Sequence, residues 1–162
     1  MKQKALIIIP TFNEKENVER MIDAILEKDT FFHVLFVDDN SPDGTADIIS
    51  SRVADSAGRV YLEKRMGKQG LGTAYIHGFK WAIKNDYDLV FEMDCDFSHS
   101  PSDLTRLCHE LENGVDLVIG SRYCKGGKIK NWPFKRILMS YFASVYVRLI
   151  LFISIKDTTA GF

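Results

Sequence analysis

The chain has 162 residues, of which 46% are hydrophobic and 27% are charged. This length is enough for one domain with a real core and too short for two ordinary ones, and the composition argues against disorder. The three cysteines, Cys95, Cys108 and Cys124, form no CxxC pair, and the N-terminal run ALIII is far too short for the core of a signal peptide. We therefore expect no zinc ribbon or disulfide framework, and a reducing compartment.

Charge is distributed unevenly along the chain. Residues 1–116 hold 13 Lys and Arg against 21 Asp and Glu, a net charge of −8, whereas residues 117–156 hold 8 basic residues and no acidic one. This asymmetry predicts that the C-terminal part meets an anionic partner, either phosphate or an acidic membrane surface. A solvated basic loop is the alternative.

The first half of the chain alternates predicted strands and helices. The apolar run 5–10 predicts a strand buried on both faces. A helix follows, with Asn13 as its N-cap and apolar residues at helical spacing up to Leu26. Residues 33–39 predict the next strand, and the turn sequence SPDGT leads from it into a second helix.

The same alternation continues in the second half. A third strand is predicted at 59–64, and the glycine-rich loop GKQGLGT leads from it into a helix. A fourth strand is predicted at 88–94, after which Ser100 and Pro101 begin a helix as its cap and first residue. Residues 116–121 predict a fifth strand. The pattern indicates an α/β fold with a mostly parallel central sheet flanked by helices.

Polar residues gather where the predicted strands end. They occupy 11–14, 38–43, 94–99 and 121–122. In open parallel sheets, ligands bind beyond the carboxyl ends of the strands. Four strand ends with polar chemistry therefore predict a ligand site at one rim of the sheet.

Asp94 and Asp96 follow the fourth predicted strand with one residue between them. In an extended segment their side chains point to the same side, while Cys95 points away. Like charges about 4 Å apart repel by about 4 kcal/mol at an effective dielectric near 20. Hard oxygen ligands of this kind suit Mg²⁺ or Mn²⁺, which takes its other ligands from water and phosphate. The alternative is a pair of exposed turn aspartates.

Two residues near this aspartate pair, His99 and Glu92, each have two possible roles. His99 is either a further ligand or second-shell donor, or a residue that packs at the entry of the next helix. Glu92 lies two residues before Asp94 on the same side of the strand. It either joins the site or holds an edge or salt-bridged position.

The glycine-rich loop at 67–73 matches neither a P-loop nor the dinucleotide-binding fingerprint. Its glycines serve either the close packing of a helix start or the approach of backbone N–H groups to a phosphate. A phosphotransferase that forms an aspartyl-phosphate is a weaker alternative. That reaction needs carboxylates further along the chain, and none lies between 117 and 156.

Several stretches together resemble a known family. The stretches are IIIPTFNEKENV, VDDNSPDGT, GLGTAYIHGF, MDCDFSHSP, GSRYCKGGKIKNWP and DTTAGF. They resemble the polyprenol-phosphate mannose synthases, also called dolichyl-phosphate mannosyltransferases, which are inverting glycosyltransferases of the GT-A type. The resemblance implies a single catalytic domain over 1–162 with a GT-A fold. Because family members continue past the last motif, it also implies a C-terminally incomplete domain.

The resemblance implies a function and a set of site residues. The function is transfer of mannose from GDP-mannose to a polyprenyl (dolichyl-type) phosphate, with inversion and with a divalent cation, Mg²⁺ or Mn²⁺. Asp96 would be the main metal ligand, with Asp94 beside it, and Asp96 and Arg122 would be catalytic. The implied substrate-binding residues are Pro10, Phe12, Glu14, Val37, Asp39, Asp94, Cys95 through its backbone, Ser98 and Arg122.

Some alternatives stay open beside this interpretation. One of Asp38 and Asp39 is expected to cap the turn before Thr45, and Arg122 has a surface salt bridge as its alternative role. A related lipid-phosphate glycosyltransferase that uses UDP-glucose or another sugar nucleotide is the main rival function. A non-catalytic nucleotide-binding module is the second rival.

The C-terminal region combines a basic loop with a long apolar segment. The loop 124–136 suits a lipid phosphate head group, and the acidic first part of the chain argues against nucleic acid as a partner. The apolar helix expected within 134–156, with its apolar core at 137–155, is long enough to span a membrane. A polar residue recurs at every fourth position, and an arginine at a bilayer centre costs roughly 2.5–3.5 kcal/mol. We therefore favour a helix at the membrane interface or against the domain over a span or an ordinary buried helix. We expect peripheral attachment to the cytoplasmic face of a membrane.

Overall fold

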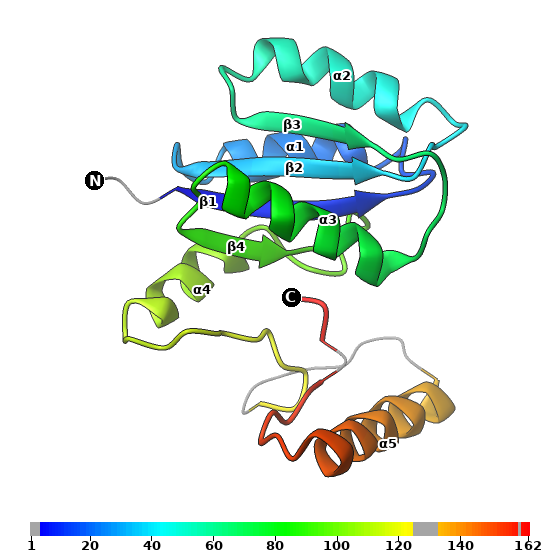
Figure 1. The fold of residues 1–162 in the computed structure, drawn as a ribbon, viewed down its shortest axis with the longest axis vertical. Coiled ribbons are helices and arrows are strands. Elements are labelled where there is room, and N and C mark those ends of the chain that lie inside the picture. Colours follow the sequence, from blue (N-terminus) through cyan, green and yellow to red (C-terminus); the bar gives the residue numbers. More distant parts are fainter. Residues whose placement is uncertain (1–3, 125–132, 159) are drawn as a thin grey trace. The chain divides into compact units, whose positions relative to one another are not determined.

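The computed structural model describes residues 4–124, 133–158 and 160–162 (Figure 1). The chain forms two compact units, Met1–Arg106 and Leu107–Phe162. The first unit contains the sheet and the helices that cover it. The second contains one long helix and the segments on either side of it.

The first unit is built on a four-stranded sheet with the order β3-β2-β1-β4, in which each pair of neighbours is parallel. This confirms the predicted α/β class. Thr11 pairs with Asp38, and Asp38 pairs with Lys64, so the carboxyl ends of three strands meet at one edge. The strands are β1 (Ala5–Thr11), β2 (Phe32–Asp38), β3 (Val60–Lys64) and β4 (Leu89–Glu92).

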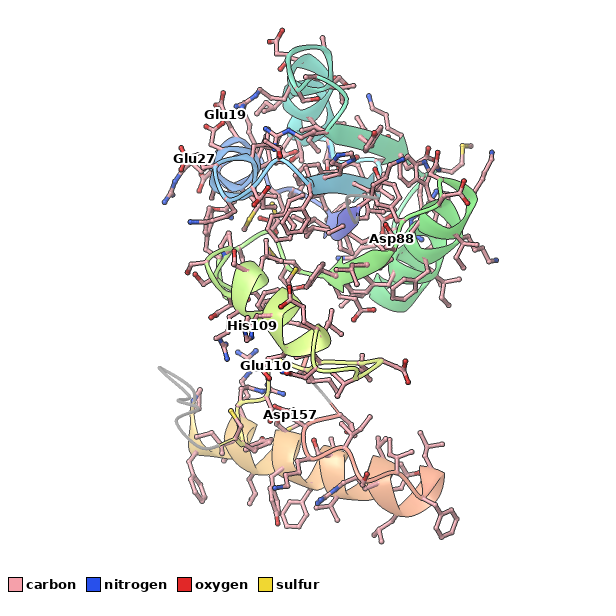
Figure 2. All side chains as sticks on the ribbon, turned by 90° about the vertical axis from the view of Figure 1, so that its left-hand side faces the viewer. Glu19, Glu27, Asp88, His109, Glu110 and Asp157 are labelled. Carbon is pink, nitrogen blue, oxygen red and sulfur yellow. The ribbon has the colours of Figure 1, made fainter. Side chains whose placement is uncertain are left out.

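Helices cover both faces of this sheet, which explains why β1 and most of β2 are apolar and buried. Figure 1 shows α1 and α3 on opposite faces. Glu19 and Glu27 lie on the exposed side of α1 (Figure 2), while Val18, Met21 and Ile22 are buried against the sheet side. The helices are α1 (Val18–Leu26), α2 (Thr45–Asp55), α3 (Leu71–Lys84), α4 (Asp103–Leu111) and α5 (Phe134–Leu151).

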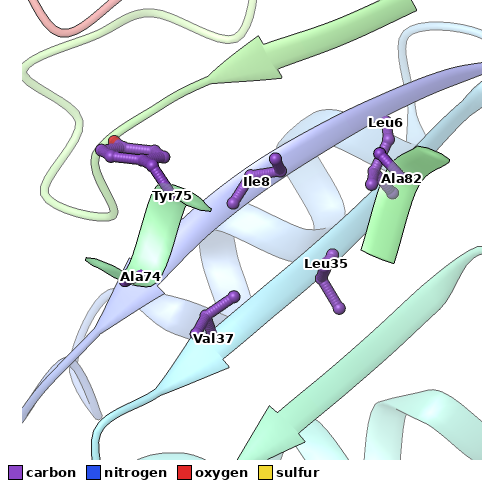
Figure 3. Close-up of a cluster of buried hydrophobic side chains, with 7 residues drawn as sticks. All are labelled: Leu6, Ile8, Leu35, Val37, Ala74, Tyr75 and Ala82. Atoms are coloured by element: carbon purple, nitrogen blue, oxygen red, sulfur yellow. The ribbon is translucent and has the colours of Figure 1, made fainter. Parts of the chain in front are cut away.

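The core between α3 and the sheet is formed by a cluster of buried side chains (Figure 3). It contains Leu6, Ile8, Leu35, Val37, Ala74, Tyr75 and Ala82. Gly78 lets α3 approach β1 closely, since a Cβ atom there would lie 2.5 Å from Cγ2 of Ile8. This packing fixes the position of α3 relative to the strand ends.

The predicted N-cap of the first helix is wrong. Asn13 adopts a positive φ of 61°, and α1 begins at Val18 after Asn17. The backbone N–H of Asn13 donates to Ser41 Oγ at 3.0 Å, and that of Glu14 donates to Thr45 Oγ1 at 3.0 Å. A helix that began at Asn13 would leave its first N–H groups without intrahelical partners. Here Ser41 and Thr45, just before and at the start of α2, accept hydrogen bonds from these N–H groups instead.

The predicted fifth strand, 116–121, is also wrong, because this segment has no strand structure. A strand needs a neighbour that continues the ladder of hydrogen bonds. Here the N–H of Gly120 donates to the carbonyl of Phe162 at 2.7 Å, and the N–H of Ser121 donates to the carbonyl of Ile119. These local bonds turn the backbone and do not extend a sheet.

The long C-terminal helix is shorter than predicted. It ends at Leu151, because Phe152 takes a left-handed conformation with φ 52°, and the residues after it are not helical. Within the described residues, no helix has both the length and the hydropathy needed to cross a membrane. The residues 125–132 of the predicted basic loop lie outside the described residues.

Two serines of the polar stripe of α5, Ser140 and Ser144, lie on its inner side, whereas Arg136 near its start is exposed. Ser144 is only 1% exposed, and Ser140 Oγ accepts a hydrogen bond from the Tyr123 hydroxyl at 3.1 Å. The exposed side carries large apolar residues instead: Phe134, Leu138, Met139, Tyr141, Phe142, Tyr146, Leu149, Ile150 and Leu151. The helix therefore presents apolar side chains to its surroundings, the reverse of an ordinary surface helix.

Candidate active site

A cleft with a volume of about 230 Å³ lies in the first unit, where the strands end. We call it the rim cleft. It is lined by Pro10, Thr11, Phe12, Glu14, Asp39, Lys68, Gly70, Leu71, Ala74, Asp94, Cys95 and Asp96.

The rim cleft brings together most of the residues that the sequence singled out. The lining includes the predicted Pro10, Phe12, Glu14, Asp39, Asp94, Cys95 and Asp96. Ser98 lies just beside it, exposed and bonded to Asp96. Val37 is fully buried in the cluster beneath α3 and is not among the lining residues. The individual roles of these residues remain predictions.

Asp94 and Asp96 reach the rim cleft by a different backbone path from the expected one. Strand β4 ends at Glu92, so both aspartates lie after the strand, and Asp96 lies in a turn. Cys95, whose backbone was expected to contact the ligand, also lines the cleft. Phe97 has a φ of 60°, which bends the chain back after Asp96.

Asp96 is exposed and is kept ionised by Ser98. Hydrogen bonds from the side chain and from the backbone N–H of Ser98, the latter at 2.9 Å, hold the pKa of Asp96 below its ordinary value of 3.8. A carboxylate that accepts such bonds keeps its charge at neutral pH. Asp96 therefore offers a permanent negative charge at the mouth of the cleft.

Asp94 is held from two sides. Its backbone N–H donates to Nδ1 of His99 at 3.2 Å, and the Tyr75 hydroxyl donates to Asp94 Oδ1 at a long 3.5 Å. Because Nδ1 of His99 accepts this bond, the proton of a neutral ring lies on Nε2, and the geometry favours a structural role for His99 over the role of metal ligand.

Two further groups beside the aspartates are shifted towards their protonated forms. Burial, and next the charge of Asp94, raise the pKa of Glu92. Burial, together with nearby carboxylates, raises the pKa of the Cys95 thiol to about 12. The thiol is thus protonated at neutral pH and is not a nucleophile.

The adjacent residues Asp38 and Asp39 have different partners. Asp38 is fully buried, and it accepts hydrogen bonds from the Thr11 hydroxyl at 3.0 Å and from the Ser41 hydroxyl and N–H at 2.6 and 2.9 Å. Asp39 lines the rim cleft and pairs with Arg65. One aspartate therefore holds the turn and the other faces the cleft.

The glycine-rich loop contributes one wall of the rim cleft through Lys68, Gly70 and Leu71. Gly70 has a φ of 98° and precedes the first residue of α3. A Cβ atom at Gly67, Gly70 or Gly72 would meet nothing within 4 Å, so these glycines do not serve close packing. Their geometry favours the other alternative, in which the free N–H groups of the helix start face an anion.

Lys68 is a lining residue that the sequence analysis did not single out. Its Nζ lies 4.6 Å from the centre of the Phe12 ring, which is a cation–π distance. Its position in a glycine-rich loop directly after a strand was the available signal. Leu71 and Ala74 carried no such signal, since apolar residues at helical spacing usually indicate core.

The carboxylates of the rim cleft fit a partly coordinated divalent cation. Among the described residues, no three His, Cys, Asp or Glu side chains gather in a group that would hold a metal. Asp94 and Asp96 offer hard oxygen ligands, and Mg²⁺ commonly takes one or two carboxylates and completes its shell with water and phosphate oxygens. The donor set therefore fits an ion that binds together with a phosphorylated ligand.

Arg122 lies in the second unit and is held by Asp157, which Figure 2 labels in the segment after α5. Its Nε and Nη2 donate to the two carboxylate oxygens at 2.9 and 2.6 Å, and its backbone N–H donates at 3.0 Å. The hydrogen bonds to Asp157 raise the pKa of Arg122. Arg122 thus forms a salt bridge, but not the surface one expected as an alternative, because the side chain of Asp157 is fully buried.

The fold occurs in solved glycosyltransferase structures. Glucosyl-3-phosphoglycerate synthase from Mycobacterium tuberculosis, crystallised with Mn²⁺, UDP and glucosyl-3-phosphoglycerate, superposes with a TM-score of 0.60 at 17% identity. The match covers 99% of this chain and 55% of that chain. The parallel sheet with its cleft beyond the strand ends is thus a sugar-nucleotide transferase fold of the GT-A type.

Sequence comparison narrows this class to a family. The model of the family described as Glycosyl transferase family 2 matches residues 6–161, and the chain belongs to this family. A polyprenol monophosphomannose synthase from Mycolicibacterium smegmatis is 42% identical over 99% of this chain and 60% of its own length. An undecaprenyl-phosphate mannosyltransferase from Micrococcus luteus is 45% identical over 98% of this chain and 65% of its own length. The chain therefore spans about three fifths of these relatives.

Proposed function

We propose that this chain transfers mannose from GDP-mannose to a polyprenyl (dolichyl-type) phosphate, with inversion at the anomeric carbon. The observation that carries the proposal is the convergence of Asp39, Asp94 and Asp96 on one cleft beside the start of α3. The identity of 42–45% to proteins named as lipid-phosphate mannose synthases and mannosyltransferases supports the choice of sugar and acceptor.

The two walls of the rim cleft suit the two halves of a sugar nucleotide. Phe12, Glu14 and Asp39 form the side proposed for the nucleoside, where a ring face and carboxylates stack on and accept bonds from a base and ribose. Lys68 and the first N–H groups of α3 form the side proposed for the diphosphate.

A divalent cation is part of the proposal because Asp94 and Asp96 bring negative charge to the cleft. Asp94 and Asp96 would repel the diphosphate of the donor, and each pair of unit charges about 4 Å apart costs about 4 kcal/mol at an effective dielectric near 20. Mg²⁺ or Mn²⁺ held by these two residues would neutralise the charge that develops on the departing diphosphate. The hydrogen bonds from Ser98 lower the pKa of Asp96 further, so the carboxylate stays ionised to a lower pH than an ordinary aspartate.

The proposed nucleophile is a phosphate oxygen of the acceptor. It is already anionic near neutral pH, so the chain does not need a base with a strongly raised pKa to activate it. The task left to the protein is to orient the two substrates. Arg122, which Asp157 holds in a fixed orientation, is proposed to contact the acceptor phosphate or the sugar.

The proposed site of action is the cytoplasmic face of a membrane, with the chain attached peripherally. The exposed apolar side of α5 and the exposed Lys135 and Arg136 at its start support this part of the proposal. Apolar side chains next to cations suit the boundary between acyl chains and anionic head groups.

The test is a transfer assay with the full chain, polyprenyl phosphate, and either GDP-mannose or UDP-glucose, with Mg²⁺, with Mn²⁺ or with a chelator. We expect mannosyl phospholipid from GDP-mannose only, and no product in the chelator. The product's anomeric configuration, read by NMR, is expected to be opposite to that of the donor. A glucosyl product would favour the rival transferase, and donor binding without transfer would favour a non-catalytic module.

A further inference from the structure

Arg65 has a largely enclosed side chain that makes three contacts next to the rim cleft. Its Nε donates to Asp39 Oδ1 at 2.5 Å, its Nη1 donates to Thr73 Oγ1 at 2.8 Å, and its Nη2 reaches the carbonyl of Gly70 at 3.4 Å. The side chains of Arg65 and Asp39 are only 7% and 10% exposed. Arg65 is thus nearly enclosed, although it follows a strand end at the molecular rim.

These contacts join two segments that form different walls of the rim cleft. Asp39 comes from the end of β2, whereas Gly70 and Thr73 come from the glycine-rich loop and the first turn of α3. Arg65 itself is not a lining residue. Its backbone N–H also donates to the carbonyl of Asp38 at 2.8 Å, which anchors it to the strand end.

We propose that Arg65 is a positioning residue for the sugar nucleotide: it sets the spacing between Asp39 and the start of α3 without contacting the ligand. This inference rests on the proposed function, because it assumes that the two walls bind the nucleoside and the diphosphate of one donor. A planar guanidinium with a rigid fork of donors suits this task, since it bonds several acceptors in one fixed arrangement.

Loss of the fork is expected to affect both walls at once. In an Arg65→Gln variant, the Asp39 carboxylate would remain in a nearly enclosed position without its counter-ion, and it is expected to turn towards solvent or a new partner. The loop would lose two of its contacts, so the donor would have to order it on binding. Both effects weaken donor binding, and neither changes the groups that act on the reacting atoms.

The experiment measures GDP and GDP-mannose binding by calorimetry, with Mn²⁺ present, well below the unfolding temperature of each variant of the full chain. For Arg65→Gln we expect affinity at least 10-fold lower, a KM for the donor raised in proportion, and kcat within about twofold. Arg65→Lys keeps the charge without the fork and is expected to restore the affinity only in part. Thr73→Val removes the hydrogen bond from Arg65 Nη1 to Thr73 Oγ1 and is expected to lower the donor affinity a few-fold.

A double-mutant cycle tests whether Arg65 acts through Asp39. If it does, Arg65→Gln costs much less affinity in an Asp39→Asn background than in the wild type. Arg52→Gln is the matched control, because Arg52 also pairs with carboxylates, Asp23 and Glu19, but on α1. It is expected to change stability slightly and donor affinity not at all.

Ligand binding and amide hydrogen exchange together distinguish failure of this inference from failure of the proposed function. If the wild type binds a nucleoside diphosphate and Arg65→Gln binds it equally well, the positioning role is wrong and the proposed function stands. If the wild type binds no nucleoside diphosphate, the proposed function is wrong. In that case faster amide exchange at 67–73 in Arg65→Gln supports Arg65 as the holder of the loop, and unchanged exchange overturns it.

Discussion

Neighbouring residues of the same type can do different work, as Asp38 and Asp39 show. Asp38 ends β2 and Asp39 follows it directly, yet Asp38 is enclosed by Thr11 and Ser41, whereas Asp39 pairs with Arg65 at the cleft. A buried carboxylate needs several donors to offset its desolvation, and each of these two residues finds a different set. Their division of labour follows from these partners.

Asp96 carries the first prediction. Replacing Asp96 with Asn removes the ionised ligand at the mouth of the rim cleft, so we expect transfer to fall by about 10²-fold or more and to lose its response to added metal. A radiolabelled donor assay over a Mn²⁺ titration measures both. Asp86→Asn is the control, since Asp86 is an exposed aspartate just beyond the C-terminal end of α3. Near-normal, metal-responsive transfer by the Asp96 variant would remove the metal role.

His33 carries a prediction about pH. Burial, and then the charges of Arg59 and Lys4, lower the pKa of His33 from its ordinary value of 6.5. The unfolded chain therefore binds a proton at a higher pH than the folded chain does, and the free energy of unfolding falls as the pH drops below 6.5 through the folded-state pKa. Above that window His33 is neutral in both states and contributes no pH dependence.

The measurement for His33 has two parts. An NMR titration is expected to place its inflection below 6.5, and urea unfolding at a series of pH values is expected to show a shallower slope in His33→Gln than in the wild type. An inflection at or above 6.5 would contradict the prediction. The variant also loses the 2.7 Å contact between Nδ1 and the Tyr87 hydroxyl, so the slopes are compared rather than the absolute stabilities.

Among the helices, α3 links the core to the site most directly. Ala74, Tyr75 and Ala82 pack into the cluster against β1 and β2, while Gly70 and Leu71 at its start line the rim cleft. The same rigid element therefore fixes the wall of the cleft through its packing two turns away. Loss of packing at Gly78 would be transmitted to that wall.

Alanine substitutions at two glycines of α3 are expected to change the free energy of unfolding in different directions. Gly78→Ala places a Cβ atom 2.5 Å from Ile8 Cγ2, and we expect it to lower the free energy of unfolding by about 1–3 kcal/mol, despite alanine's better helix propensity. Gly72→Ala meets nothing within 4 Å and is expected to leave stability unchanged or to raise it by up to about 1 kcal/mol. Urea unfolding measures both, and equal effects would contradict the close approach of α3 to β1.

For the whole chain, charge and exposed apolar surface are the features that extend beyond the rim cleft. The acidic residues lie mainly before residue 117, and the first acidic residue after that point is Asp157. Asp157 forms a salt bridge with Arg122. The exposed Lys135 and the exposed apolar side of α5 thus suit contact with an anionic, apolar surface.

Membrane attachment carries the last prediction. Leu149→Glu places a charge on the exposed apolar side of α5, where Leu149 is 69% exposed, and we expect about 10-fold weaker binding of the full chain to vesicles with anionic lipid. Co-sedimentation measures this. Ile83→Glu is the control, because Ile83 is 76% exposed on α3. Equal binding by wild type and Leu149→Glu would exclude α5 as the contact.

The sequence predicted the strands of the sheet closely, and it placed Asp94 and Asp96 correctly at the carboxyl edge. Continuous apolar runs are distinctive because a strand covered on both faces has no polar side. The prediction of a fifth strand at 116–121 was wrong. DLVIGS has a strand-like composition, but a strand also needs a neighbouring strand to pair with, and composition does not show whether one is present. The N-cap at Asn13 failed because Ser41 and Thr45, distant in sequence, bind the N–H groups of that segment.

Local pattern was thus sufficient for the α/β class, for the polar rim and for the family resemblance, because periodicity and motif spacing are properties of short stretches. Long-range contacts assigned the partners: Arg65 to Asp39, Asp157 to Arg122 and Gly78 to Ile8. The orientation of α5 belongs with these, since the sequence showed a polar stripe on one side of the helix but not that Ser140 and Ser144 of this stripe face inward. Which face a helix buries, and which carboxylate meets which cation, depends on what folding brings within a few ångströms, and no short stretch contains that information.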